Sequence, residues 1–242
     1  YQFMQQSVCC AAGAENTVTL TLWPETPETL PRPEYNNPSF DRSMNGWLCL
    51  NGTWQFAFDP ENRGVAEHWY HPDTPAYDRA IRVPFSWASL MGFGEEALAC
   101  GDTLHQSNTV TNNYHITGEF GWYRRSFTVP TTFPEDASVV LHIGACANVT
   151  YVWLDGGYVD MRVDEYSDLA FDLGALKPGS RHTLAVKAQF PHDIPSHSIG
   201  KQIFWFASSP GIWQSVWIEP RRASYVKALQ VKPELAFEGE AA

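Results

Sequence analysis

The sequence predicts an all-β protein built as a sandwich of antiparallel sheets. From Trp47 onward, short aromatic and β-branched segments alternate with Gly, Pro and Asp residues, which is typical of this fold. Residues 151–159 contain two such segments joined by Asp-Gly-Gly, which indicates a tight hairpin because glycine accepts positive φ. No stretch shows the apolar spacing of a long amphipathic helix.

The strands are expected in one domain between residues 46 and 222. Residues 1–45 are predicted to be an extended lead-in, because prolines recur from Pro24 to Pro38 and disfavour regular structure. Residues 223–242 are assigned to the start of a linker or of a following domain. With 242 residues, 44% of them hydrophobic, the chain can bury a sizeable core. The predicted strands are 47–58, 80–84, 121–129, 138–143, 148–154, 158–163, 168–172, 181–189, 212–219 and 224–231.

Alternation within the strands predicts which face is buried. In residues 181–189, Leu184, Val186 and Ala188 lie on one side of the strand and are expected to face the core. Pro130 and Pro220 are each expected to end a strand, because proline removes a backbone donor.

Two connections are much longer than ordinary loops, residues 86–120 and 191–210. Long connections inside a compact domain are commonly functional or disordered. Both connections contain polar and aromatic residues, so both are candidates for ligand contacts.

Charge and composition exclude several classes of partner. The formal net charge of -11 and the pI near 5.1 argue against binding to nucleic acid or to an anionic membrane surface. The apolar stretches are strand-sized, well short of the roughly 20 residues that a membrane helix needs. No partner of either class is expected.

The cysteines and the N-terminus bear on the compartment. No Cys-x-x-Cys spacing is present, so buried free thiols are predicted rather than a zinc site or a structural disulfide. No intact signal peptide is visible at the N-terminus. A cytoplasmic, bacterial-type protein is favoured, and an exported parent whose signal was trimmed is the alternative. The cysteines are Cys9, Cys10, Cys49, Cys100 and Cys146.

The acidic residues and histidines match no catalytic or metal-binding pattern. Glu95 and Glu96 are neighbours on a loop, where adjacent side chains point opposite ways, so they are interpreted as solvated charge. Asp164 and Asp168 flank a predicted hairpin and suit turn positions. The histidines of residues 192–197 lack the spacing of a ligand pair. We expect no catalytic residue, metal or cofactor in this chain.

Ten tryptophans are the remaining chemical signal, since aromatic rings stack on the apolar faces of sugars. Trp87 and Trp205 lie on the two long connections and are the candidates for exposed rings. The tryptophans in predicted strands are assigned to packing, namely Trp54, Trp153, Trp213 and Trp217.

Three segments resemble one known family. They are residues 50–60 (LNGTWQFAFDP), 121–130 (GWYRRSFTVP) and 211–220 (GIWQSVWIEP). In this order and spacing they resemble the N-terminal domain of glycoside hydrolase family 2, which includes β-galactosidases, β-glucuronidases and β-mannosidases. The aromatic strand and Asp-Gly turn of residues 151–156 resemble a hairpin of the same domain. The resemblance covers roughly residues 32–233.

The resemblance implies a jelly-roll-like β-sandwich of the galactose-binding-domain type, usually called the sugar-binding domain. In the family it precedes an immunoglobulin-like domain and a (β/α)8 barrel that carries two catalytic glutamates. In the galactosidase and glucuronidase branches, an aspartate six residues before the Gly-Ile pair holds sugar hydroxyls, and here that position is Trp205. This departure counts against a strict galactosidase or glucuronidase substrate. Residues 200–202 (GKQ) resemble those of less characterised members.

We therefore expect the non-catalytic N-terminal domain of a retaining β-glycosidase, which packs on its own C-terminal catalytic barrel and shapes access to a carbohydrate substrate. An oligomer is compatible with this role. The alternatives are a free-standing carbohydrate-binding module and a purely structural inter-domain module. The candidate substrate contacts are Trp205, Lys201, Gln202, Trp87 and Asn113.

Overall fold

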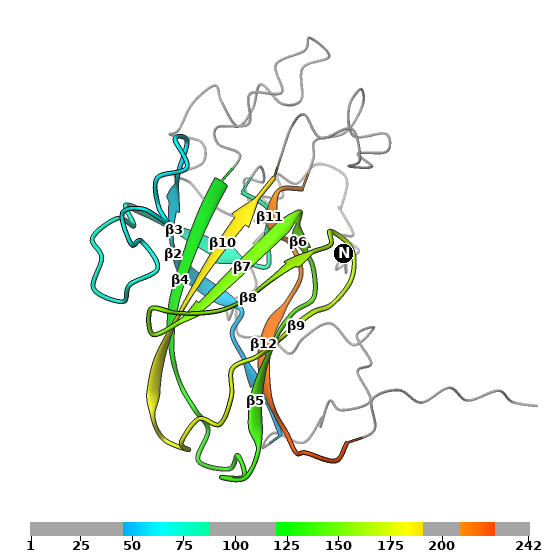
Figure 1. Cartoon of the computed structure of the whole chain (residues 1–242). Helices are drawn as coiled ribbons and strands as arrows, with labels where there is room; N and C mark the ends of the chain where they lie inside the picture. The colour runs from blue at the N-terminus through cyan, green and yellow to red at the C-terminus, as the bar shows by residue number, and fades with distance from the viewer. Residues whose placement is uncertain (1–45, 88–119, 191–208, 226–242) are drawn as a thin grey trace, which may run out of the picture.

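A computed structural model describes residues 46–87, 120–190 and 209–225. Every regular element in these ranges is a β-strand, and the strands form two larger antiparallel sheets and one small one (Figure 1). The prediction of an all-β sandwich is confirmed. No helix in the described ranges is long and apolar enough to cross a membrane.

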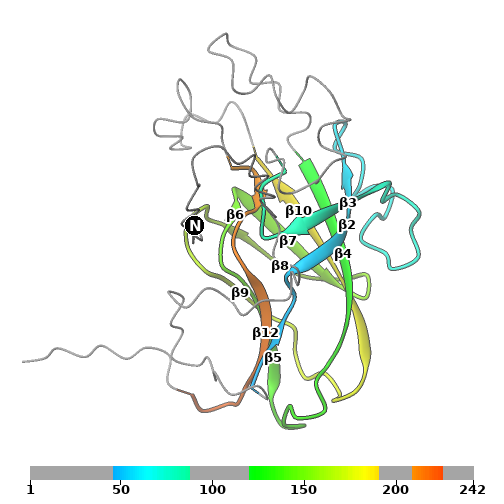
Figure 2. The same ribbon diagram turned by 180° about the vertical axis from the view of Figure 1, so that it is seen from behind.

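The larger sheet has six strands in the order β3-β2-β4-β10-β7-β8. The second sheet has the order β1-β12-β5-β9 and is seen from behind in Figure 2. A short pair, β6 and β11, lies beside them. The bounds are β1 Leu48–Cys49, β2 Gly52–Phe58, β3 Arg79–Val83, β4 Phe120–Thr128, β5 Ser138–Ile143, β6 Cys146–Ala147, β7 Val149–Leu154, β8 Gly157–Val163, β9 Leu169–Asp172, β10 Arg181–Gln189, β11 Gly211–Ile212 and β12 Val216–Arg221.

The core lies between the two larger sheets. Leu184, Val186 and Ala188 of β10 are fully buried in it, as the alternation predicts. From the opposite sheet, Leu141 of β5 and Ile218 of β12 project into the same cluster. Apolar burial of this kind is the main favourable contribution to folding.

The outer face of the six-stranded sheet is also covered, which the sequence reasoning did not predict. Residues 59–78, the cyan segment between β2 and β3 in Figure 1, pack across it. The ring of Tyr70 stacks on Trp153 with centroids 5.4 Å apart and planes 7° apart. Trp153 in turn stacks on Trp122 of β4 at 5.1 Å. The sheet is therefore the middle layer of three.

The hairpin between β7 and β8 forms as predicted. Leu154 pairs with Gly157, and the two residues between them have positive φ, 50° at Asp155 and 84° at Gly156. Asp155 Oδ1 also accepts a hydrogen bond from the backbone N–H of Thr183, at 2.7 Å. Positive φ at both central positions is what a tight two-residue hairpin requires.

The single strand predicted at 47–58 is two strands in different sheets. Asn51 lies at the break, where its Nδ2 donates to Ser215 Oγ at 3.1 Å and its Oδ1 accepts from Val216 N at 2.8 Å. These contacts turn the chain from β1, beside β12, into β2, and Gly52 takes a φ of 120° there. The side-chain oxygen of Asn51 thus satisfies the backbone N–H of Val216, which has no strand partner at the break.

The strand predicted at 212–219 also divides, into β11 and β12, and Pro220 does not end it. Leu50 N donates to Val216 O, so alternate residues of β12 turn their backbone groups toward β1. Pro220 lies beyond the last residue that β1 pairs, Ile218, so its missing N–H costs no ladder bond. Pro130 does follow the end of β4, as expected.

Of the remaining sequence predictions, some fall on described residues and the others do not. Cys146 is buried and Cys49 half-buried, both as free thiols, and burial raises the pKa of Cys146 to about 12. The other cysteines, most of the predicted strand 224–231 and the lead-in 1–45 lie outside the described residues. The division into lead-in, sandwich and tail stays a prediction.

Candidate functional site

The described ends of the two long connections lie together at one end of the sandwich, the upper end in Figure 1. Ser86 Oγ and the backbone N–H of Trp87 both donate to the carbonyl of Pro210, at 2.9 and 3.2 Å. Phe120 and Gln189 pair at the last register position of β4 and β10. Two segments distant in sequence therefore leave the sandwich from one place.

Trp87 is not the exposed ring that the sequence predicted, because its exposed fraction is 0%. Its ring lies between Phe58, Phe56 and Tyr123, with centroid distances of 5.9, 6.0 and 6.4 Å. The hydrogen bond from the backbone N–H of Trp87 to Pro210 O holds the backbone at the end of the sheet, so the side chain enters the core there. Trp87 fixes the base of the first connection and cannot stack on a ligand.

Two glycines make room for Trp87. A Cβ at Gly211 would lie 2.2 Å from the Tyr123 hydroxyl and 2.5 Å from Trp87, and a Cβ at Gly121 would lie 2.5 Å from Trp87. The Tyr123 hydroxyl accepts a hydrogen bond from Ile212 N at 3.2 Å. Burial raises the pKa of Tyr123 well above its usual value, so the phenol stays neutral and structural.

The other predicted contacts lie outside the described residues. Lys201, Gln202 and Trp205 belong to the second connection and Asn113 to the first. Their roles stay predictions. What the structure adds is that both connections start and finish at the same end of the sandwich.

A buried lysine lies near that end on the outer face of the six-stranded sheet. Lys187 Nζ donates to Asn62 Oδ1 at 2.5 Å and lies 4.5 Å from the ring centroid of Phe120. Burial lowers its pKa, and the charge of Asp59 opposes that shift. Sequence reasoning missed it, although Lys187 is the one charged position among the apolar residues of 184–188.

Asp59 joins the outer segment to the sheet. Its carboxylate accepts hydrogen bonds from Arg63 N at 2.7 Å, Gly64 N at 2.8 Å and Trp122 Nε1 at 3.0 Å. Charge-assisted bonds to a buried carboxylate are stronger than neutral ones. Together with the Lys187 contact they hold residues 59–64 on the outer face, which is a structural role.

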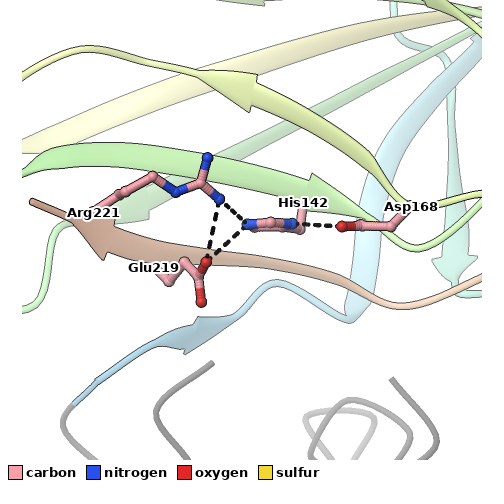
Figure 3. A network of polar contacts seen from close by, with 4 residues as sticks. All are labelled: His142, Asp168, Glu219 and Arg221. Carbon is pink, nitrogen blue, oxygen red and sulfur yellow. Dashed lines mark hydrogen bonds and ion pairs between the residues drawn. The ribbon is translucent and has the colours of Figure 1, made fainter. Parts of the chain in front are cut away.

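A second charged cluster lies on the outer face of the four-stranded sheet (Figure 3). His142 of β5 contacts Asp168 Oδ2 through Nδ1 at 2.9 Å and Glu219 Oε1 through Nε2 at 3.0 Å. Arg221 Nη2 lies 3.5 Å from the same Glu219 oxygen. The imidazole stacks on Trp217 with centroids 4.9 Å apart and planes 4° apart.

The cluster favours a protonated imidazole. Burial lowers the pKa of His142, but the hydrogen bonds and charges of Asp168 and Glu219 outweigh it, so the pKa is raised. With His142 charged, the two cations His142 and Arg221 face the two carboxylates of the cluster. The negative charge of the fully buried Glu219 is then balanced by neighbouring positive charge.

These carboxylates cannot act on a glycosidic bond. Retaining glycosidases need two carboxyl groups about 5 Å apart on either side of the bond. Here the imidazole ring of His142 lies between Asp168 and Glu219. Asp164 has the predicted turn role, since its Oδ1 accepts from Tyr166 N and Ser167 N at 2.8 and 3.0 Å. Among the described residues, no group of His, Cys, Asp or Glu is arranged to hold a metal ion.

Comparison with known proteins identifies the family. Residues 48–220 match the family model for the sugar binding domain of the family 2 glycosyl hydrolases. The chain belongs to glycoside hydrolase family 2. The match spans the sandwich from β1 to β12.

The curated relatives of this family 2 chain are glycosidases. It is 26% identical to a "Beta-galactosidase large subunit" of Leuconostoc lactis, over 76% of this chain and 31% of the relative. It is 29% identical to a "Beta-glucuronidase" of Paenibacillus borealis, over 44% of this chain and 15% of the relative. The chain thus spans a third or less of these two relatives.

A solved structure supports the fold. The crystal structure of Ruminococcus gnavus β-glucuronidase matches with a TM-score of 0.58 and 21% identity, over 79% of this chain and 31% of that one. At this level of identity the likeness concerns the fold alone.

Proposed function

We propose that this family 2 chain is the non-catalytic N-terminal domain of a retaining β-glycosidase, an enzyme that hydrolyses O-glycosyl bonds. The domain packs on the catalytic barrel, and its two long connections shape the path of the substrate. The observation that carries this is the junction of Ser86 and Trp87 with Pro210, which brings the bases of both connections to one end of the sandwich.

A rigid base is what such a role needs. Loops position ligand contacts well only when a packed scaffold holds their ends. Here Trp87, Gly121 and Gly211 interlock at the bases, and β4 and β10 pair as far as Phe120 and Gln189. The barrel supplies the two glutamates, which divide the roles of nucleophile and acid/base.

Within the connections, residue chemistry suggests the contacts. The ring of Trp205 suits stacking on the apolar face of a pyranose, whereas Lys201, Gln202 and Asn113 suit hydrogen bonds to its hydroxyls. A Trp at position 205 favours a sugar or aglycone with an apolar face over one held mainly by a carboxylate.

The substitution Trp205→Ala in the full-length protein tests the proposal. We expect KM for the best β-glycoside substrate to rise by about tenfold, with kcat changed less, because one stacked ring is worth about 1.4 kcal/mol at most. Tyr158→Ala is the matched control, since Tyr158 is an exposed ring at the hairpin, at the opposite end of β7 from the loops. Equal kinetic effects of the two substitutions would contradict a substrate contact at position 205.

A further inference from the structure

Among the strands that the structure describes, β8 is an edge of the six-stranded sheet. No described strand pairs with its outer side. On the outer face, Tyr158, Met161 and Val163 are 58%, 37% and 65% exposed. An apolar strand at an open edge is a template to which another chain can add a strand.

The register identifies the backbone groups that face outward. Asp164 N, just after β8, donates to the carbonyl of Asn148, just before β7. The pair Thr150 and Arg162 lies two positions further along both strands. Bonded and non-bonded pairs alternate in an antiparallel ladder, so Arg162 turns its backbone groups toward β7. Met161 and Val163 then turn theirs toward the open edge.

The backbone of Met161 is already occupied by its neighbours' side chains. Asp160 Oδ1 accepts a hydrogen bond from Met161 N at 2.7 Å, and Arg162 Nη1 donates to Met161 O at 2.9 Å. The two side chains also form an ion pair with each other. An added strand would need the same N–H and C=O groups.

Two further features hold this arrangement. The Arg162 guanidinium lies 5.3 Å from the ring centroid of Phe171 in β9, which anchors it over the gap between the sheets. A register shift between Val152 and Trp153 leaves Val159 as an extra residue in β8. Such a bulge twists an edge and hinders pairing.

We propose that Asp160 and Arg162 form an edge guard, which keeps β8 from pairing with β8 of a second copy of this chain. A second copy is the occupant that the edge would otherwise fit. Antiparallel pairing about a two-fold axis at Met161 places Asp160 opposite Arg162 of the other copy, so the edge is complementary to itself in charge. In the guard, Asp160 and Arg162 form their ion pair with each other within one chain, and not with a second copy.

The lowered pKa of Asp160 keeps the ion pair of the guard charged over a wide pH range. The Met161 N–H and then Arg162 lower the pKa of Asp160, so the carboxylate stays ionised well into the acidic range. The inference is independent of the proposed glycosidase role, because neither connection takes part in it.

The charge-neutral double substitution Asp160→Ala with Arg162→Ala tests the guard in the 242-residue chain. We expect the variant to acquire a concentration-dependent dimer in sedimentation velocity, with the circular dichroism spectrum of a folded β-protein. Asp160→Ala alone retains the Arg162 contact with Phe171 and should show the same trend more weakly. Glu61→Ala with Arg63→Ala is the matched control, because it removes an exposed ion pair from residues 59–78.

Adding Met161→Pro to the double variant separates edge pairing from other association. Proline removes the outward N–H and is tolerated on a free edge, so the new dimer should disappear. Sedimentation of the folded double variant identical to that of the unsubstituted chain would overturn the proposal. A dimer that persists with Pro at 161, or one that the control pair also forms, would overturn it as well.

Discussion

Replacing Gly211 by alanine is expected to lower the free energy of unfolding by about 2–4 kcal/mol. The backbone φ of Gly211 is 82°, which an L side chain adopts only with strain. The added Cβ would also lie 2.2 Å from the Tyr123 hydroxyl and 2.5 Å from Trp87, both fully buried. Urea unfolding of the two proteins, followed by tryptophan fluorescence, measures the difference.

Gly174→Ala is the matched control for this substitution. Gly174 has a similar φ of 79°, but nothing lies within 4 Å of its added Cβ. We expect it to cost only about 1 kcal/mol, the backbone part of the effect. Equal losses at Gly174 and Gly211 would show that the junction beneath the connections is not tightly packed.

Glu219→Ala is expected to destabilise the fold by about 3–5 kcal/mol near neutral pH, because it leaves the buried His142 cation with one carboxylate partner fewer. Glu219 and His142 are both fully buried, and Arg221 also loses its ion-pair partner. Glu67→Ala removes an exposed ion pair with Arg63 and should cost about 0–1 kcal/mol.

The pH dependence of the same cluster has a defined sign. The folded-state pKa of His142 is raised above the 6.5 of an ordinary histidine. The contribution of protonated His142 to the free energy of unfolding is therefore fully present below that value. The contribution is lost as the pH rises through the folded-state pKa. The cost of Glu219→Ala should therefore be larger at about pH 6 than at about pH 9.

His142→Gln supplies the control for the pH series. It should remove this part of the pH dependence, and the imidazole resonance of His142 in the unsubstituted chain should titrate above the range of ordinary histidines. A titration below that range would contradict the assigned charge state.

The strands could be predicted from the sequence because alternation and turn residues are local signals. Ser138–Ile143 and Arg181–Gln189 were predicted at their observed bounds for this reason. The break at Asn51 could not be, since the groups it binds, Ser215 and Val216, are more than 160 residues away. Trp87 was placed on the surface because its segment lacks periodicity, whereas its burial depends on Gly211.

The charged cluster was missed, although a signal for it exists. His142 interrupts the apolar run of residues 139–143, and Glu219 follows the apolar residues 216–218. A charged residue inside each of two apolar strands indicates a buried pair only once the strands are known to be neighbours. That β5 and β12 pair in the register that joins Trp217 to His142 follows from the fold.

Hydrolysis of chromogenic β-glycosides by the full-length natural protein and by the 242-residue chain, both carefully repurified, tests the central claim most directly. We expect the full-length protein to hydrolyse at least one β-glycoside with retention of anomeric configuration, as read by NMR of the first product, and the chain alone to hydrolyse none. Turnover by the chain alone, or an inverted product from the full-length protein, would contradict the assignment of this chain as the non-catalytic domain of a retaining β-glycosidase.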